Sequence, residues 1–289
     1  MGRGLRQKDL ATALGLAQTT IANYEQKLRF PDEPTLVRIA DFFAVSLDHL
    51  MGRDGAEKAA PGGSPDPAGP DVLPKPAAEY LELLRKEGVG AARARLQEFR
   101  EAGMDLKHLY LGVFAPALRE VGRQWAAGML SVGDEHAFSE ATQRLMAHFS
   151  PGPGTLANGR GKCVVLAASG ESHMIGARMV ADFLSMAGFD VRFLGGNLSI
   201  GHALEMLRSS PPALVAISIT LPEHLDAAQD LIRAIRADRS LSRIRILAGG
   251  QALDAHGAAA ARIGADAFGI DADEAAKAAL ALLGDAPGG

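Results

Sequence analysis

The sequence predicts a multidomain protein of mixed α and α/β class, in which helical modules precede a doubly wound parallel sheet. Three observations predict this fold class. Residues 54–77 are rich in proline and glycine, so they divide a short N-terminal module from a larger body. Residues 78–149 show helical spacing of apolar residues and no strand-like alternation. From residue 161 onward, short Val/Ile/Leu-rich runs alternate with helical stretches, which is typical of βαβ units.

The N-terminal module, residues 1–53, has the residue pattern of a helix-turn-helix. Leu10 and Leu14 share one helical face, Gly15 suits a turn with positive φ, and Ile21 returns to the core. The segment resembles the Xre/Cro-type repressor domain. That resemblance implies binding to a double-stranded DNA operator through one residue at the first helix and four at the start of the recognition helix: Gln7, Gln18, Thr19, Thr20 and Asn23. Amide and hydroxyl groups suit base edges in the major groove.

The module departs from that family at its start. Such domains begin with another helix of about ten residues, whereas here residues 1–6 precede Gln7. Either the true start lies upstream, or the module is under-packed and binds DNA weakly. A small helical protein-interaction domain is the alternative reading. Residues 54–77, with their repeated prolines, are expected to form a disordered, partly extended linker.

The segment of residues 78–150 predicts a bundle of about four helices, with breaks near Gly103, Gly128 and Gly133. Within it, Trp125 precedes the pair Glu135 and His136 in a W-x9-E-H pattern. A large indole can stack on the flat face of a ligand, and a carboxylate can accept hydrogen bonds from it. The alternative is that Trp125 anchors the core and the pair lies on a solvated helix start.

The segment of residues 161–284 predicts a five-stranded parallel sheet of flavodoxin-like order, 2-1-3-4-5. The expected strands are residues 162–168, 189–194, 213–219, 243–248 and 265–270. The expected helices are residues 174–187, 200–209, 222–237, 254–263 and 272–283. Small residues at the strand ends are expected to open a slot beside the sheet.

The loop after the first of these strands carries Glu171 and His173 between Gly170 and Gly176. A neutral imidazole is a good metal ligand, and a carboxylate on its other ring nitrogen fixes the tautomer. The sequence Glu171-Ser172-His173-Met174-Ile175-Gly176 resembles the D/E-x-H-x-x-G signature of cobalamin-binding domains. That resemblance implies that His173 is the lower axial ligand of cobalt, oriented by Glu171. The remaining cofactor contacts that it implies are Ser172, Gly176, Gly195, Gly196, Ser218, Thr220, Gly249 and Gly250.

The W-x9-E-H pattern resembles the cap of the CarH/LitR family of light-responsive transcriptional regulators. That resemblance implies that Trp125 covers the adenosyl group of adenosylcobalamin, with Glu135 and His136 close by. In the best-studied regulators of this type a His follows the Trp and captures cobalt after photolysis. Here that position is Ala126, so another upper ligand or a different response is needed.

The patterns together favour a cobalamin-dependent transcriptional regulator, not an enzyme, whose adenosylcobalamin responds to light and changes its oligomerisation, as a dimer or tetramer, and its DNA binding. One alternative is a light-independent cobalamin-sensing regulator or antirepressor. Another is a corrinoid methyl carrier of a methyltransferase system. An NAD-dependent Rossmann enzyme is excluded because no G-x-G-x-x-G follows the first predicted strand.

The composition limits which functions and cellular locations are possible. The net charge of −4 argues against polyanion binding by the whole surface, and residues 1–53 carry seven Lys/Arg against six Asp/Glu. The single cysteine, Cys163, lies in a predicted strand and is expected to be a small buried hydrophobe. No apolar run is long enough to span a membrane and no signal peptide is recognisable, so we expect a cytoplasmic protein.

Overall fold

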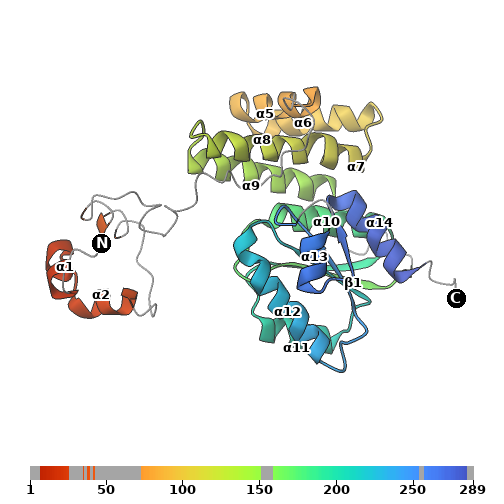
Figure 1. Ribbon diagram of the computed structural model, residues 1–289. Coiled ribbons are helices and arrows are strands. Elements are labelled where there is room, and N and C mark those ends of the chain that lie inside the picture. The colour runs from red at the N-terminus through yellow and green to blue at the C-terminus, as the bar shows by residue number, and fades with distance from the viewer. Residues whose placement is uncertain are drawn as a thin grey trace. The chain divides into compact units, whose positions relative to one another are not determined.

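The structure is a computed structural model, and it describes residues 7–25, 35, 38–39, 42, 73–150, 159–253 and 257–284. The chain divides into two compact units, Met1–Ala59 and Ala60–Gly289 (Figure 1). Most of the expected linker lies outside the described residues, and the first helix of the second unit begins at Lys75, before the expected boundary at residue 78. No helix in the described ranges combines the length and apolarity that crossing a bilayer requires.

The N-terminal unit contains the two helices of the expected helix-turn-helix, α1 (Gln7–Leu14) and α2 (Gln18–Glu25). Gly15 has a φ of 62° in the turn between them, a conformation that favours glycine. Ala11, Leu14 and Ile21 are buried together with Ile39. The guanidinium of Arg38 donates a hydrogen bond to the carbonyl of Leu14, the last residue of α1.

Residues 73–150 form a bundle of four helices, as expected. The third helix contains a π-helical segment. The elements are α5 (Lys75–Lys86), α6 (Val89–Glu101), α7 (Leu106–Leu109), the π-helical η1 (Tyr110–Phe114), α8 (Ala115–Ala126) and α9 (Val132–Phe149). Elements α7, η1 and α8 follow one another without a break, so together they make the third helix. Helix α9 starts with a capping box, in which Ser131 and Asp134 satisfy each other's backbone N–H groups.

The C-terminal domain is a parallel sheet with the order β2-β1-β3-β4-β5, which confirms the expected topology. Its strands are β1 (Lys162–Ala167), β2 (Asp190–Gly195), β3 (Leu214–Ser218), β4 (Arg245–Gly249) and β5 (Ala267–Gly269). Its helices are α10 (Met174–Met186), α11 (Ile200–Ser209), the 3-10 turn η2 (Pro222–His224), α12 (Leu225–Ala237), α13 (Ala258–Ile263) and α14 (Ala272–Leu283).

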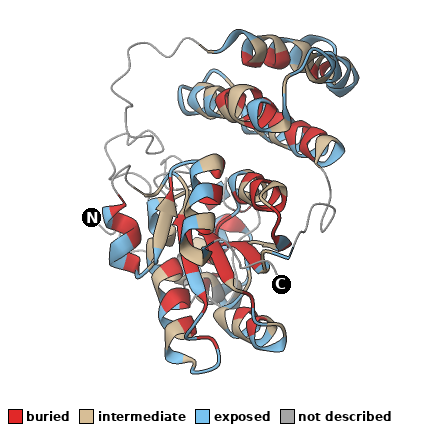
Figure 2. Ribbon diagram, turned by 90° about the vertical axis from the view of Figure 1, so that its right-hand side faces the viewer, coloured by how far each residue is buried: buried red, intermediate tan, exposed pale blue. Residues whose placement is uncertain are grey.

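Successive residues of each strand point to opposite faces of the sheet, so both faces carry apolar side chains. Helices cover both of these faces. Val165 and Ala216 pack in one apolar cluster with residues of α10 and α14. Val164 and Val215 pack in another cluster with residues of α11, α12 and α13. Buried positions line the strands and the inner sides of these helices in Figure 2. Cys163 is buried, as expected.

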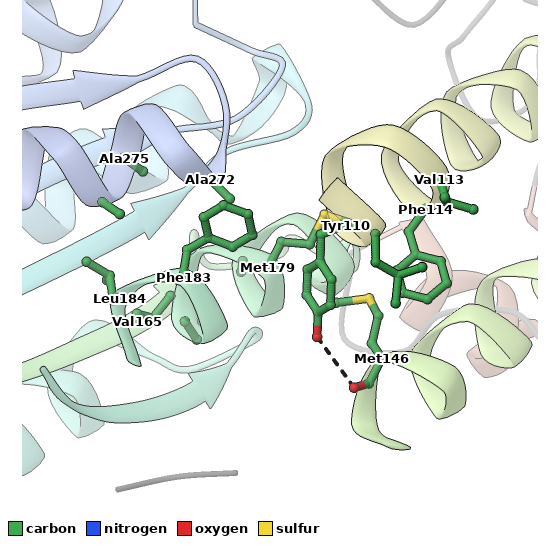
Figure 3. Close-up of a cluster of buried hydrophobic side chains, with 14 of the residues drawn as sticks. Tyr110, Val113, Phe114, Met146, Val165, Met179, Phe183, Leu184, Ala272 and Ala275 are labelled. Carbon is green, nitrogen blue, oxygen red and sulfur yellow. Dashed lines mark hydrogen bonds between the residues drawn. The ribbon is translucent and has the colours of Figure 1, made fainter. Parts of the chain in front are cut away.

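The helical bundle packs on the face of the sheet that α10 and α14 cover, so the two share one core. Tyr110 of η1 contacts Phe183 of α10, with ring centroids 6.0 Å apart (Figure 3). The Tyr110 hydroxyl also donates a 2.7 Å hydrogen bond to the buried carboxylate of Asp182. Lys107 of α7 forms a 2.8 Å ion pair with Asp273 of α14.

Candidate functional site

The candidate site lies at the carboxyl edge of the sheet, where the strand order reverses. Strand β1 pairs with β2 on one side and with β3 on the other, so the loops that follow β1 and β3 leave this edge side by side. Ligands of doubly wound sheets bind in the crevice at such a point. The loop of residues 168–173 follows β1, and the loop of residues 219–224 follows β3.

Glu171 joins these two loops through its buried carboxylate. One oxygen accepts hydrogen bonds from the backbone N–H of His173 at 2.9 Å and from the Nδ1 of its ring at 2.5 Å. The other oxygen accepts hydrogen bonds from the backbone N–H groups of Thr220 and Leu221, at 2.9 and 3.2 Å, and from Nδ1 of His224 at 3.0 Å.

This arrangement keeps the Glu171 carboxylate ionised. Burial, the largest single effect, acts to raise its pKa, but hydrogen bonds from His173, His224 and the Thr220 backbone together outweigh it and lower the pKa to about 2. The acceptor is therefore a full carboxylate across the neutral pH range, and it favours the His173 tautomer that carries its proton on Nδ1.

His173 itself points out of the loop. Its side chain is 52% exposed, whereas that of Glu171 is 0% exposed. Because Nδ1 is engaged by Glu171, the lone pair of Nε2 remains for a ligand. An exposed imidazole with a carboxylate on its other nitrogen is a donor arrangement that suits a transition-metal ion, so these residues fit the lower-ligand role that the resemblance implies.

His224 and Leu221 were not among the expected site residues. His224 ends the 3-10 turn η2, and only 17% of its side chain is exposed. Its Nε2 lies 3.4 Å from the point that a Cβ on Gly170 would occupy, so the ring sits against the turn before Glu171. The sequence did contain a signal for His224: a histidine shortly after the third predicted strand is expected at the same sheet edge as Glu171.

The small residues of this edge have two different roles. A Cβ on Gly196 would lie 2.6 Å from the Glu171 carbonyl oxygen, and one on Gly250 would lie 2.2 Å from that of Ile219. Close backbone packing therefore requires both glycines. A Cβ on Gly195 would meet nothing within 4 Å, so this position is open.

The remaining expected residues lie around the same edge. Gly249 ends β4 and Ser218 ends β3, while Gly176 lies in the first turn of α10. Ser172 is exposed and Ser218 is buried. The backbone N–H of Thr220 donates to the Glu171 carboxylate, which places Thr220 beside the His173 loop.

The bundle residues of the W-x9-E-H pattern lie at the α8–α9 turn. Trp125 is 43% exposed, so it is not the core anchor of the alternative reading. Glu135 accepts a 2.6 Å hydrogen bond from Ser139, and His136 lies 3.7 Å from its carboxylate. Among the described residues, no hydrogen bond or ion pair joins this group to the His173 loop.

The expected DNA-contacting residues gather on the helix-turn-helix. Gln18 and Thr19 are exposed at the start of α2, and Thr20 is partly buried. Gln7 begins α1. Asn23 belongs to α2, and its side chain lies outside the described part of the structure.

Comparison with known families decides what kind of protein this is. Two family models, both described as a B12 binding domain, match residues 161–281 and residues 78–149. A helix-turn-helix model matches residues 2–50. The chain is a cobalamin-binding protein with an N-terminal helix-turn-helix. The first match covers the sheet that presents His173, and the second covers the helical bundle packed on it.

Individual relatives match different parts of this cobalamin-binding protein. It is 28% identical over 203 residues to dimethylamine corrinoid protein 3 of Methanosarcina acetivorans, which covers 68% of this chain and 88% of the relative. The HTH-type transcriptional regulator ImmR of Bacillus subtilis is 36% identical over 55 residues, 19% of this chain and 43% of that protein. The structure of the Methanosarcina barkeri monomethylamine corrinoid protein matches with a TM-score of 0.63 at 20% identity, over 71% of this chain and 96% of that one, and shows the shared fold.

Proposed function

We propose that this chain is a cobalamin-dependent transcriptional regulator. One observation carries the proposal: an exposed imidazole, oriented by a buried carboxylate, is built into a chain that begins with a helix-turn-helix. A cofactor carrier needs no DNA-binding head, whereas a sensor that acts on transcription needs both parts. In this proposal the protein is cytoplasmic and has no catalytic activity of its own.

His173 is proposed to bind the lower face of cobalt through Nε2, while Glu171 holds its ring and tautomer. Gly195 leaves open space beside this site for the cofactor. Bound adenosylcobalamin supplies a cobalt–carbon bond that light can break. The protein's part is to orient the imidazole and to fix its tautomer through the ionised carboxylate.

The upper face is proposed to be covered by Trp125, with Glu135 and His136 beside it. Support comes from the exposure of Trp125, since an indole that is 43% exposed is accessible to a ligand. An adenosyl group offers an aromatic surface and ribose hydroxyls that match an indole and a carboxylate. Ala126 follows Trp125, so the second imidazole ligand at that position is absent from this chain.

Operator binding is proposed to use Gln7, Gln18, Thr19, Thr20 and Asn23. One helix-turn-helix makes few base contacts, so useful affinity requires two heads on neighbouring half-sites. Cofactor state can then control DNA binding through the assembly of dimers or tetramers, provided that the two cofactor states differ in their interaction with the assembled form.

The test is an absorption spectrum of the protein with adenosylcobalamin before and after green light, followed by DNA shifts in both conditions. We expect a spectral change on illumination and a change in DNA affinity. A spectral change with identical DNA binding in the dark and in light removes the light-sensing part. A colourless protein after incubation with corrinoids removes the sensor altogether.

A corrinoid methyl carrier is the second candidate, because the dimethylamine corrinoid protein matches over 203 residues, more than the bundle or the sheet domain alone contains. This candidate predicts that the protein accepts a methyl group on cobalt and passes it to a thiol when a methyltransferase is added. Turnover of methylcobalamin with a thiol, without any effect of cofactor on DNA binding, would favour it over the regulator.

A further inference from the structure

The amino edge of the sheet, opposite to the His173 loop, carries a concentration of arginine that the proposed cofactor site does not use. Five arginines fall within residues 233–245, against one acid, Asp238, in a chain whose net charge is −4. The segment runs from the last turns of α12 to the first residue of β4. A local positive surface therefore stands out on an acidic protein.

Part of this charge is neutralised within the domain. Asp238 accepts a 2.6 Å hydrogen bond from Nε of Arg208 of α11. Asp266 accepts one of 2.6 Å from Arg236, which also donates to the carbonyl of Ile244 at 2.7 Å. These contacts tie the turn of residues 238–244 to the ends of two helices, and they engage the carboxylates of Asp238 and Asp266.

Arg233 lies 3.4 Å from the carboxylate of Asp230 within α12. The other three arginines form what we call the arginine patch: Arg239, Arg243 and Arg245. All three are exposed, and their guanidinium groups have no ion pair or hydrogen bond with any residue that the structure describes. Leu241 and Ile244 are buried between them and anchor the turn. The patch is thus a set of three free cations on a fixed turn.

The partner that fits is the DNA phosphate backbone. Helix α2 contains no basic residue, and residues 1–53 have seven Lys/Arg against six Asp/Glu, so the helix-turn-helix supplies little attraction to phosphate. DNA-binding proteins derive much of their affinity from Lys and Arg on phosphates. The planar guanidinium matches phosphate oxygens especially well.

We propose that the arginine patch is a second DNA contact, which binds phosphates of duplex DNA. The inference rests on the proposed function, since it takes DNA as the partner. Arg245 begins β4 and Gly249 ends it, so the patch and the cofactor edge lie about 13 Å apart along the strand. Cobalamin and DNA can therefore be bound at the same time.

The test uses the full-length protein and a fluorescently labelled DNA duplex of mixed sequence. The triple variant Arg239→Gln, Arg243→Gln, Arg245→Gln should bind between about tenfold and a hundredfold more weakly at 0.1 M salt. The slope of log affinity against log salt should become shallower by about 2 to 3. Replacing the same three arginines with lysine should retain most of the slope, because the charge remains.

The matched control removes three exposed arginines from the bundle, as Arg93→Gln, Arg119→Gln and Arg144→Gln, and should keep the wild-type slope. Gln18→Ala should bind the duplex more weakly with an unchanged slope, because it removes a contact of the helix-turn-helix without removing a charge. If the triple variant binds like the wild type while Gln18→Ala is impaired, the inference is wrong and the proposed function stands. If the wild-type protein binds no duplex, both this inference and the proposed function are wrong. Loss of binding to phosphatidylglycerol vesicles, with unchanged DNA binding, would assign the patch to a membrane instead.

Discussion

At the scale of single residues, Glu171 has the most demanding position, because five hydrogen-bond donors converge on its two oxygens. Glu171→Gln would turn an NH2 group toward some of these donors and remove the charge that fixes the His173 tautomer. We expect cobalamin affinity to fall by about 10- to 100-fold. Absorption titration with cobalamin measures this, and Glu140→Gln, an exposed surface change, serves as the control. Equal affinities for the two variants would contradict the role given to Glu171.

The depressed pKa of Glu171 also predicts a pH dependence of stability. The folded protein holds this pKa at about 2, below the ordinary value of 4.5. The ionised carboxylate therefore contributes its full stabilisation above about pH 4.5, and loses it as the pH falls toward 2. The contribution is about 3 kcal/mol near neutrality. Urea unfolding of cofactor-free protein should show the gap between wild type and Glu171→Gln shrinking from about pH 6 to about pH 3. A constant gap would mean that the carboxylate is not specifically stabilised.

The His173–Glu171 pair could be predicted from the sequence because the two residues are neighbours in one loop. His224 could not, since its partner Glu171 lies 53 residues away and the contact exists only once β1 and β3 are paired. Thr220 was an expected cofactor contact, but its backbone hydrogen bond to Glu171 could not be predicted, because a backbone N–H leaves no trace in the residue type. Contacts made by the backbone, or between distant loops, depend on the folded sheet.

At the scale of elements, the strands and helices of the sheet domain follow directly from the alternation of apolar runs and helical stretches. The π-helical segment Tyr110–Phe114 was not predicted, because an extra residue in a helical turn hardly changes the apolar spacing. Its consequence is local: it lies where the bundle meets α10, and it carries the hydroxyl that binds Asp182.

Tyr110→Phe tests that contact between the bundle and α10. The change leaves the buried Asp182 with one donor fewer, so we expect a loss of about 1.5–3 kcal/mol in unfolding free energy. Tyr80→Phe is the matched control, because the Tyr80 hydroxyl is equally buried but bonds to Thr142 within the bundle, at 2.9 Å. We expect a smaller loss there, since the partner is uncharged. Urea unfolding measures both, and equal losses would show that the Asp182 bond contributes nothing special.

The glycines at the sheet edge give a second element-scale prediction. Gly250→Ala would place a Cβ 2.2 Å from the Ile219 carbonyl oxygen at a φ of 115°, so we expect a loss of several kcal/mol and a clearly lower melting temperature. Gly195→Ala has a φ of 73° and open space, so only the backbone cost of about 1 kcal/mol applies. Thermal denaturation of the two variants checks the contrast. Similar losses would mean that close packing is not what requires Gly250.

At the scale of the whole molecule, the order of its parts follows from composition, because the Pro/Gly-rich stretch and the change from helical to alternating patterns mark the segments. The family matches fall on the same three segments. The response to the cofactor could not be predicted from the sequence. It depends on a free-energy difference between two assembled states, which no single sequence segment encodes.

Coupling between the two ends of the chain is therefore the decisive property to measure. If the protein is a cobalamin-dependent regulator, DNA affinity with and without adenosylcobalamin should differ by a factor of about 5 to 150, the usual range of coupling between sites. In the His173→Ala variant this ratio should fall to one, because cobalt loses the ligand through which the sheet domain senses it. Fluorescence anisotropy on labelled operator-containing DNA gives the ratio, and size-exclusion chromatography of the same samples reports the accompanying change of assembly. A wild-type ratio of one, in protein that demonstrably binds cobalamin, would separate DNA binding from cofactor binding and leave the methyl carrier as the better account.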